Sequence, residues 1–365
     1  MNKKVRLGFD RLENRLVLSA DPLFDNQWNL QTIHAEQAWN SASTTNSPVV
    51  AVVDSGVDLN NQDIKANLWI NPKEIANDGI DNDNNGYVDD TSGWNFTNWS
   101  NRPQDNYYHG TMVSGIIGAV KDNNIGIAGV SPCVKILPIK IQDDNGIGYA
   151  GVAAAGIGYA TMMKLRGENI AAINISWTSG LADNITLRNS IQQANDAGIV
   201  VVVAAGNDGC DLGVTPHYPS CYNFSNMIVV GGINSDLSFA GYSNYSKSVV
   251  DVAAPSSGII SILPNNAYGN MSGTSFAAPQ VSGAVAFLKS IDIRYSASQI
   301  KQAILDGASY VLNLADKVRV GVLDMMGATN VLKKMVPAGS VTSQPVSAPS
   351  TLPVPSLGKI EYHFD

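Results

Sequence analysis

The chain has 365 residues, of which 44% are hydrophobic and 15% are charged, and its formal net charge at neutral pH is −8. This length allows one large domain or two ordinary ones. The acidic balance argues against a nucleic-acid-binding or anionic-membrane-binding surface and leaves carboxylates for cations. The longest strongly apolar run, residues 198–206, is about half as long as a spanning helix, so no membrane span is predicted.

The two ends of the chain differ in composition from the middle. Residues 1–20 carry an excess of basic side chains but no apolar centre of a secretory signal, which indicates either an export-type segment or a disordered tail. Residues 337–365 begin with a stretch rich in proline, serine and valine, which is typical of a flexible linker or tail. Residues 21–336 therefore form the predicted globular domain.

Within this domain, short β-branched runs alternate with longer helical stretches. The runs are continuously apolar, as in parallel strands that are buried on both faces. They cover residues 49–54, 134–141, 170–176, 199–205, 227–233 and 249–254. Helices are expected over residues 149–165, 185–197 and 276–290. The alternation predicts a three-layer, doubly wound α/β domain with a central, mostly parallel sheet and helices on both faces.

Three side chains stand where such a sheet places its chemistry, at strand carboxyl ends and helix amino ends. Asp54 ends the first run, His109 opens a helical stretch punctuated by glycines, and Ser275 begins the last helix. A serine hydroxyl attacks a carbonyl only when an imidazole takes its proton and a carboxylate orients that imidazole. Asn207 follows the run 199–205, and its amide is a candidate donor to a developing oxyanion.

The segments around these residues resemble the subtilisin-like serine proteases. The resemblance rests on Val-Val-Asp-Ser-Gly-Val-Asp, His-Gly-Thr-x-Val-x-Gly and Gly-Thr-Ser-x-Ala-x-Pro, in the order Asp, His, Ser. It implies that Asp54 orients His109, that His109 is the general base and acid, that Ser275 is the nucleophile and that Asn207 stabilises the oxyanion. Taken singly, each segment is better explained by a turn or a helix cap, and it is their joint occurrence in this order that favours the catalytic interpretation.

The chain departs from the family pattern at three points. Met112 stands where a second histidine is usual, and Phe276 follows the nucleophile where methionine is common. Family members usually carry a long folding prosegment, whereas about twenty residues precede the domain here, so how the domain matures is left open.

The family resemblance also implies a substrate site built from two edges that would bind the substrate backbone as an added strand. The first pocket is expected between the second edge and the strand that precedes Asn207, with His217 at its base, and a broad preference for apolar or aromatic side chains follows. His217 would narrow that pocket or add charge at low pH, unless it is an exposed loop residue. The predicted substrate residues are Gly146, Ile147, Gly148, Ser176, Trp177, Thr178, Ala204, Ala205, Gly206 and His217.

The same glycines, with Gly151, also match the dinucleotide pattern G-x-G-x-x-G. A dinucleotide site requires an acidic residue after the next strand, and residues 170–176 end without one. An NAD-type oxidoreductase therefore remains a remote alternative.

Calcium is predicted at an acidic loop. Residues 81–90 alternate oxygen ligands around a glycine, like the first half of an EF-hand loop, but Ser92 stands where the closing glutamate would be. The loop resembles the calcium-binding insertions of some subtilisin-like enzymes; the alternative is an acidic surface loop without an ion. The predicted ligands are Asp81, Asp83, Asn85, Tyr87, Asp89 and Asp90.

The resemblance implies a second structural calcium site in the loop formed by residues 121–127. Its ligands would be the Asn123 side chain, the Asp21 and Asp63 carboxylates, and the carbonyls of Lys121, Ile125 and Ile127.

The three cysteines are too few for a disulfide scaffold. Cys210 and Cys221 are a candidate bridge, which would require an oxidising compartment and leave Cys133 without a partner; three reduced thiols are the alternative. Calcium dependence and the hazard of a protease inside the cell both favour an extracytoplasmic or secreted location.

Together these features predict a calcium-stabilised, monomeric serine endopeptidase that acts on proteins or peptides through an acyl-enzyme. The principal alternative is a catalytically silent peptide-binding relative, against which the joint presence of Asp54, His109, Asn207 and Ser275 argues.

Overall fold

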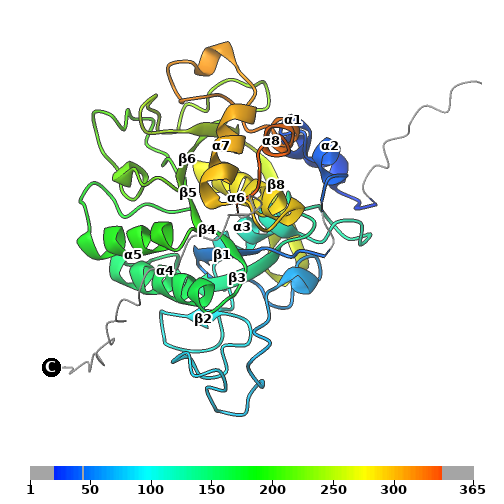
Figure 1. The fold of residues 1–365 in the computed structure, drawn as a ribbon, viewed down its shortest axis with the longest axis vertical. Helices are drawn as coiled ribbons and strands as arrows, with labels where there is room; N and C mark the ends of the chain where they lie inside the picture. The colour runs from blue at the N-terminus through cyan, green and yellow to red at the C-terminus, as the bar shows by residue number, and fades with distance from the viewer. Residues whose placement is uncertain (1–19, 43–44, 339–365) are drawn as a thin grey trace, which may run out of the picture.

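A seven-stranded parallel sheet forms the centre of the molecule (Figure 1), seen here in a computed structural model that describes residues 20–42 and 45–338. The strand order is β2-β3-β1-β4-β5-β6-β7, and β8 and β9 form a separate antiparallel pair. The strands are β1 (Val49–Asp54), β2 (Trp94–Asn95), β3 (Lys135–Lys140), β4 (Ile170–Ile175), β5 (Val200–Ala204), β6 (Met227–Ile233), β7 (Val252–Pro255), β8 (Ile259–Leu263) and β9 (Ala267–Met271).

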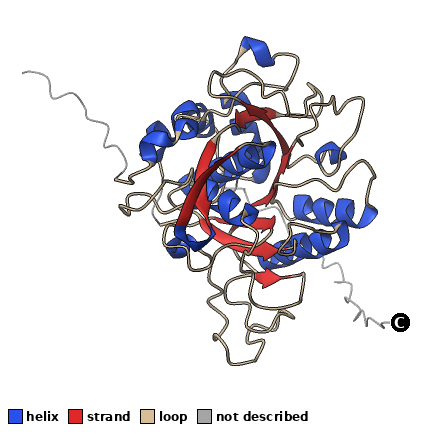
Figure 2. Ribbon diagram, turned by 180° about the vertical axis from the view of Figure 1, so that it is seen from behind, coloured by secondary structure: helices blue, strands red, loops and turns tan. Residues whose placement is uncertain are grey.

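Helices cover both faces of this sheet (Figure 2), as the alternation of runs predicts. The α-helices are α1 (Trp28–Thr32), α2 (Ala35–Trp39), α3 (His109–Gly118), α4 (Ala150–Leu165), α5 (Ile185–Asp196), α6 (Thr274–Ile291), α7 (Ala297–Gly307) and α8 (Met325–Leu332). Short 3-10 helices are η1 (Phe24–Asn26), η2 (Lys65–Asn67), η3 (Ser220–Tyr222), η4 (Pro264–Asn266) and η5 (Leu312–Leu314). The predicted doubly wound α/β fold is confirmed.

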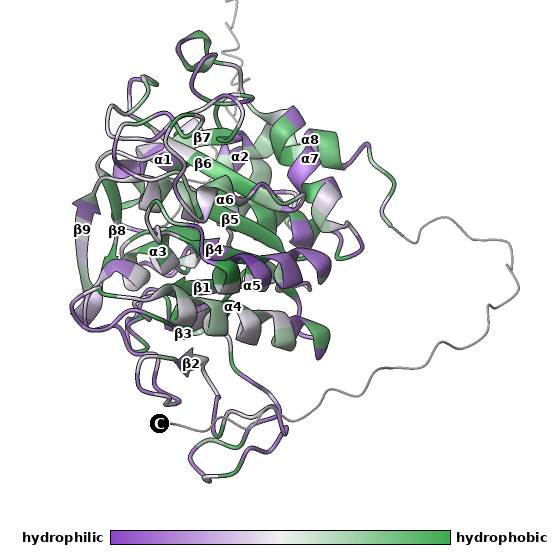
Figure 3. Ribbon diagram, turned by 90° about the vertical axis from the view of Figure 1, so that its left-hand side faces the viewer, coloured by the Kyte–Doolittle hydropathy of each residue, from purple (hydrophilic) through white to green (hydrophobic). Residues whose placement is uncertain are grey.

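Each central strand contributes to two hydrophobic cores, because its side chains alternate between the faces of the sheet. In β1, Val50 and Val52 pack with the core that contains α3 and α6, whereas Val49, Ala51 and Val53 pack with the core under α4 and α5. Figure 3 shows the resulting hydrophobic band of strands between the helix layers. Burial on both faces explains why these strands are continuous rather than alternating apolar runs.

The chain passes from β3 on one side of β1 to β4 on the other. The carboxyl ends of β1 and β4 thus border the point where the sheet changes winding direction, which is where open α/β sheets bind ligands. The long loop between η2 and β2 projects beyond the β2 edge (Figure 1). The terminal segments predicted over residues 1–20 and 337–365 lie almost entirely outside the described residues. Among the helices described, none is long and apolar enough to cross a membrane.

Candidate active site

Asp54 and His109 form the centre of the site. Asp54 is the last residue of β1 and is fully buried, and His109 is the first residue of α3. Nδ1 of His109 lies 2.8 Å from Oδ1 and 3.0 Å from Oδ2 of Asp54. The backbone N–H of Ser55 donates to the same Oδ1 at 2.7 Å, which fixes the carboxylate. With Nδ1 held by a carboxylate, Nε2 of His109 is the nitrogen available to take a proton.

Two opposing effects set the pKa of His109. Burial would lower this pKa, but the charge and hydrogen bond of Asp54, with the charge of Asp105, outweigh burial and raise it above its usual value. The imidazolium is therefore stabilised at the position where a general base would become charged.

Ser275 is the second residue of α6, where its hydroxyl lies in the first turn of the helix. Its Oγ donates to the carbonyl of Ser176, the residue after β4, at 2.9 Å, and Oγ of Ser176 donates back to the Ser275 carbonyl at 2.9 Å. Across the described chain, no hydrogen bond joins Ser275 to His109. The ring of Phe276, the next residue, lies 5.6 Å from the His109 ring, so α6 packs against the imidazole.

Asn207 faces the start of α6. Its Oδ1 accepts hydrogen bonds from the backbone N–H of Thr274 at 2.8 Å and from the Thr274 hydroxyl at 3.0 Å. A backbone N–H can only donate, so the acceptor must be the amide oxygen, and the NH₂ group stays available. The Asn207 side chain is exposed, in keeping with a donor that faces a ligand rather than the core.

The two predicted substrate edges border one hollow of about 240 Å³. Gly146, Ile147 and Gly148 line one side and Trp177 and Thr178 the other. The Trp177 indole N–H donates to the Val53 carbonyl at 2.8 Å, which holds the ring in this hollow. The lining of this hollow combines apolar side chains, such as Ile141 and Trp177, with the polar side chains of Gln142 and Ser179.

The predicted walls of the first pocket also approach one another. Gly206 has a φ of +102°, and a Cβ there would lie 3.6 Å from Cγ2 of Thr178. Ala204 and Ala205 are buried, Ala204 at the end of β5 and Ala205 next to it. His217 is also buried rather than exposed: Nδ1 lies 3.3 Å from Oδ2 of Asp208, and Nε2 lies 3.6 Å from Sγ of Cys210.

Comparison with known proteins decides the family. The sequence profile of the subtilase family matches residues 45–330. The chain belongs to the subtilase family. It is 35% identical over 299 residues to thermitase from Thermoactinomyces vulgaris, covering 82% of this chain and 91% of that one. It is 33% identical over 305 residues to subtilisin-like protease 1 of Plasmodium falciparum (isolate 3D7), covering 78% of this chain.

The chain spans 44% of that Plasmodium relative's length. Among solved structures, a protease from Pseudoalteromonas arctica PAMC 21717 matches with a TM-score of 0.71 at 24% identity, covering 86% of this chain and 99% of that one. This likeness concerns the fold.

The acidic loop of this subtilase contains carboxylates that accept backbone N–H groups of the loop itself. Both oxygens of Asp81 accept backbone N–H groups of its own turn, from Asn85 and Gly86, and both oxygens of Asp89 accept those of residues 78 and 79. These two carboxylates therefore bind the backbone of the loop, and their part in the predicted ligand set stays a prediction. The Tyr87 ring packs against Trp94 and Tyr159.

Asp83 and Asp90 instead converge with Glu74, which the sequence analysis missed. One oxygen from each lies within 4.8 Å of the others. Burial is the main cause that raises the pKa of Asp90 to about 6, against hydrogen bonds from Tyr159, Asn71 and Asn85. Oε2 of Glu74 and Oδ1 of Asp83 are buried without a hydrogen-bond donor, although Arg166 lies 3.4 Å from the latter.

The loop formed by residues 121–127 does bring together Asp21, Asp63 and Asn123. Asp21 accepts the backbone N–H groups of Asp122 and Asn123, and Asp63 accepts the Asn123 amide and the Ile127 N–H. The hydroxyl of Tyr268 on β9 also donates to Asp63 at 3.1 Å. Both carboxylates are thus already hydrogen-bonded, and burial raises the pKa of Asp63. Lys121 pairs through its side chain with Asp122, and its predicted ligand is the backbone carbonyl.

The predicted Cys210–Cys221 bridge is absent from the structure, in which Cys133, Cys210 and Cys221 are all free. The Cys210 thiol instead donates to Oδ1 of Asn244 at 3.3 Å, and burial raises the pKa values of both Cys210 and Cys221. Neither thiol therefore has the depressed pKa that marks a reactive cysteine.

Proposed function

We propose that this subtilase is a serine endopeptidase that cleaves proteins or peptides through an acyl-enzyme. Ser275 Oγ would attack the carbonyl carbon of the scissile bond while its proton passes to Nε2 of His109. His109 then gives this proton to the leaving amine, and water repeats the sequence to release the acid. The observation that carries the proposal is the buried Asp54 carboxylate bonded to Nδ1 of His109 at 2.8 Å.

Attack requires the Ser275 hydroxyl to leave the Ser176 carbonyl. Rotation about a single side-chain bond redirects Oγ, and the cost is one neutral hydrogen bond of about 1 kcal/mol. The freed Ser176 carbonyl would then accept a backbone N–H of the bound substrate. Ser176, whose carbonyl holds the Ser275 hydroxyl before substrate binds, would thus become part of the edge that binds the substrate backbone.

The amide NH₂ of Asn207 is proposed to donate to the oxyanion of the tetrahedral intermediate. Thr274 supports this role, because its N–H and hydroxyl both hold the opposite end of the amide. A donor that is oriented before the reaction needs no reorganisation when charge develops.

Substrate is proposed to lie as an extended strand between residues 146–148 and residues 176–178. The hollow between these edges, with Trp177 and Ile141 in its lining, suits an apolar side chain. The first pocket, with Ala204, Ala205 and Gly206 in its wall and His217 near its base, is proposed to prefer apolar or aromatic residues before the cleaved bond.

We also propose that Glu74, Asp83 and Asp90 hold a structural calcium ion. Three converging carboxylates with two oxygens lacking a donor suit a hard cation that takes oxygen ligands. Such an ion would add stability by binding only the folded state. The second site, in the loop formed by residues 121–127, rests on the family resemblance. Calcium use also supports the proposed extracytoplasmic location.

Hydrolysis of an internally quenched peptide library tests the activity, with Ser275→Ala as the matched control. Mass spectrometry should find new internal termini with wild-type chain and none with the variant. Peptide binding without cleavage by a folded wild-type chain would instead support a silent peptide-binding relative. Release of only terminal residues would contradict the endopeptidase assignment. The remote alternative, a dinucleotide-dependent oxidoreductase, would need a bound nucleotide, and the peptide assay contains none.

A further inference from the structure

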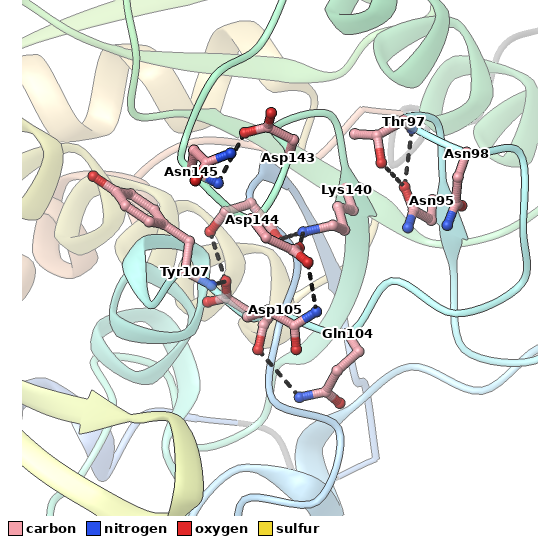
Figure 4. A network of polar contacts seen from close by, with 12 residues as sticks. Asn95, Thr97, Asn98, Gln104, Asp105, Tyr107, Lys140, Asp143, Asp144 and Asn145 are labelled. Carbon is pink, nitrogen blue, oxygen red and sulfur yellow. Dashed lines mark hydrogen bonds and ion pairs between the residues drawn. The ribbon is translucent and has the colours of Figure 1, made fainter.

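Asp105 is a buried carboxylate that has no part in the roles proposed for Asp54, His109 and Ser275. It lies four residues before His109 and is 1% exposed. Oδ1 accepts the backbone N–H of Tyr107 at 2.9 Å (Figure 4) and that of Tyr108 at 3.1 Å. Oδ2 accepts the N–H of Thr111 at 2.9 Å and its hydroxyl at 2.6 Å. A third contact to Oδ1 comes from Oγ of Ser55 at 3.0 Å. Five donors therefore converge on one carboxylate.

Three of these donors belong to the backbone around the start of α3. Tyr108, the residue before the helix, makes no capping contact with its own side chain. The first N–H groups of a helix need acceptors, and a negative charge is favoured at that end. Asp105, in the preceding loop, supplies both the acceptor oxygens and the negative charge. The helix whose first residue is His109 is thus anchored by this carboxylate.

Ser55 directly follows Asp54 and links Asp105 to Gly110, the residue that follows His109. A serine hydroxyl has one hydrogen, and Ser55 gives it to Asp105. Its lone pairs then accept the N–H of Gly110 at 2.8 Å, while its own N–H donates to Asp54. Ser55, which follows Asp54, is therefore hydrogen-bonded to Gly110, which follows His109. Asp105 polarises the Ser55 hydroxyl that makes this contact.

We infer that Asp105 is a positioning residue for the proposed reaction, holding His109 against Asp54 through Ser55 and the first turn of α3. This inference rests on the proposed role of His109 as general base. Asp105 does not touch substrate. It fixes the distance and angle between imidazole and Asp54, and its buried charge favours the imidazolium that forms when Ser275 loses its proton.

The charges around His109 support an electrostatic contribution as well as a geometric one. Asp54 faces the ring from β1 and Asp105 lies in the loop before α3, and both raise the pKa of His109 against the effect of burial. Lys140, at the end of β3, donates to the Ser55 carbonyl at 2.8 Å and pairs with Asp144 (Figure 4), and Asp58 is buried in the turn after β1. Helix α6 contributes the uncharged Phe276 to this packing.

The test is the pH profile of kcat and kcat/KM for Asp105→Asn, measured on the full chain with a fluorogenic peptide. We expect kcat to fall about 10- to 100-fold, with KM little changed, because small misplacement of a catalytic group has costs of this size. The acid limb of the profile should also move to lower pH, since one of the two charges that raise the His109 pKa is removed. A purely structural cap would not move that limb.

Asp58→Asn is the matched control. Asp58 is also buried, but its side chain accepts from Asn60, Gln104 and Asn265 rather than from the residues around His109. This variant should lose stability while the acid limb stays in place. An Asp105→Asn chain with wild-type kcat and an unmoved acid limb would overturn the inference.

Ser55→Ala keeps the test decisive where Asp105→Asn does not fold. It removes the hydroxyl that links Gly110 to Asp105, so kcat should fall while the acid limb stays, because both carboxylates remain. Wild-type kcat in a folded Ser55→Ala chain would contradict the positioning role. Failure of the proposed function itself looks different: the wild-type chain would then show no activity that His109→Ala removes.

Discussion

Thr274 holds Asn207 by two hydrogen bonds, one from its backbone N–H at 2.8 Å and one from its hydroxyl at 3.0 Å, both to the same amide oxygen. Thr274 directly precedes Ser275, so the proposed oxyanion donor and nucleophile are tied to one helix start. Any shift of α6 would move both together. Their relative geometry is therefore insensitive to small movements of the helix.

Asn207→Leu should lower kcat by about 10²- to 10³-fold and leave KM nearly unchanged, because the lost hydrogen bond forms mainly in the transition state. This magnitude comes from the corresponding donor in subtilisin and not from the present structure. Stopped-flow kinetics on an ester substrate measure it. Thr274→Val is the control: it keeps the backbone donor and removes only the hydroxyl, so its loss should be far smaller. Equal losses in the two variants would argue against Asn207 as the donor.

Activity should decline on the acid side as His109 takes a proton, at a pH above the ordinary pKa of histidine because the pKa of His109 is raised. Asp54→Asn should remove about 10⁴-fold of kcat by misorienting the imidazole, and should shift the remaining acid limb downward. The ion pair affects stability in the opposite direction. A raised histidine pKa stabilises the fold at low pH, and this contribution disappears as pH rises through the folded-state value. Proton NMR of the His109 ring reports the pKa directly; an unshifted value would contradict the account.

Calcium should raise the thermal midpoint, and Asp83→Asn should abolish most of that increase. At about 100 times the dissociation constant, the ion adds about 2.7 kcal/mol to the free energy of unfolding. Calorimetry with calcium or with a chelator measures the effect. Asp81→Asn is the control, because Asp81 accepts only from its own turn. Affinity should also weaken as pH falls below about 6, where Asp90 takes a proton. Identical calcium responses in both variants would show that calcium does not bind at Glu74, Asp83 and Asp90.

Gly110→Ala should disrupt the active site. A Cβ at this position would lie 2.1 Å from the Gly56 carbonyl oxygen and 3.2 Å from Cβ of Asp54, so α3 must move away from β1. Both activity and unfolding free energy should fall, as measured by peptide hydrolysis and urea denaturation. Gly158→Ala, on α4 with open space around it, should instead be neutral or stabilise the fold by about 0.4–1 kcal/mol. Wild-type activity for Gly110→Ala would show that the close packing of α3 on β1 is dispensable.

The strands of the sheet could be predicted from sequence because they are buried on both faces. The runs 49–54 and 227–233 coincide with β1 and β6. The run 249–254 begins too early, since the N–H groups of Val249 and Val250 donate back to Ser246 in a turn before β7. Helix α7 was missed although its start carries the capping box Ser296-Ala-Ser-Gln299, which is a readable signal. The short β2 has no such pattern.

The residues of the site also differ in how far the sequence predicts their position. Asp54, His109, Asn207 and Ser275 follow strands or open helices, so their placement follows from topology. Glu74 and Tyr268 reach their carboxylate partners through loop and hairpin packing, which no local spacing encodes. Alternate spacing does not predict which carboxylates of the acidic loop also accept backbone N–H groups, and the calcium ligand set stays a prediction. The hydrogen bonds of Asp81 and Asp89 to the backbone are seen only in the structure.

The most direct test of the central claim is labelling with a fluorophosphonate, which reacts with a serine only when its hydroxyl is activated. The adduct would be mapped by mass spectrometry on the wild-type chain, with Ser275→Ala and His109→Ala as controls and circular dichroism to confirm folding. The account predicts one adduct, on Ser275, that both variants lose. A folded wild-type chain that carries no adduct, or carries it on another serine, would contradict the assignment of Ser275 as nucleophile.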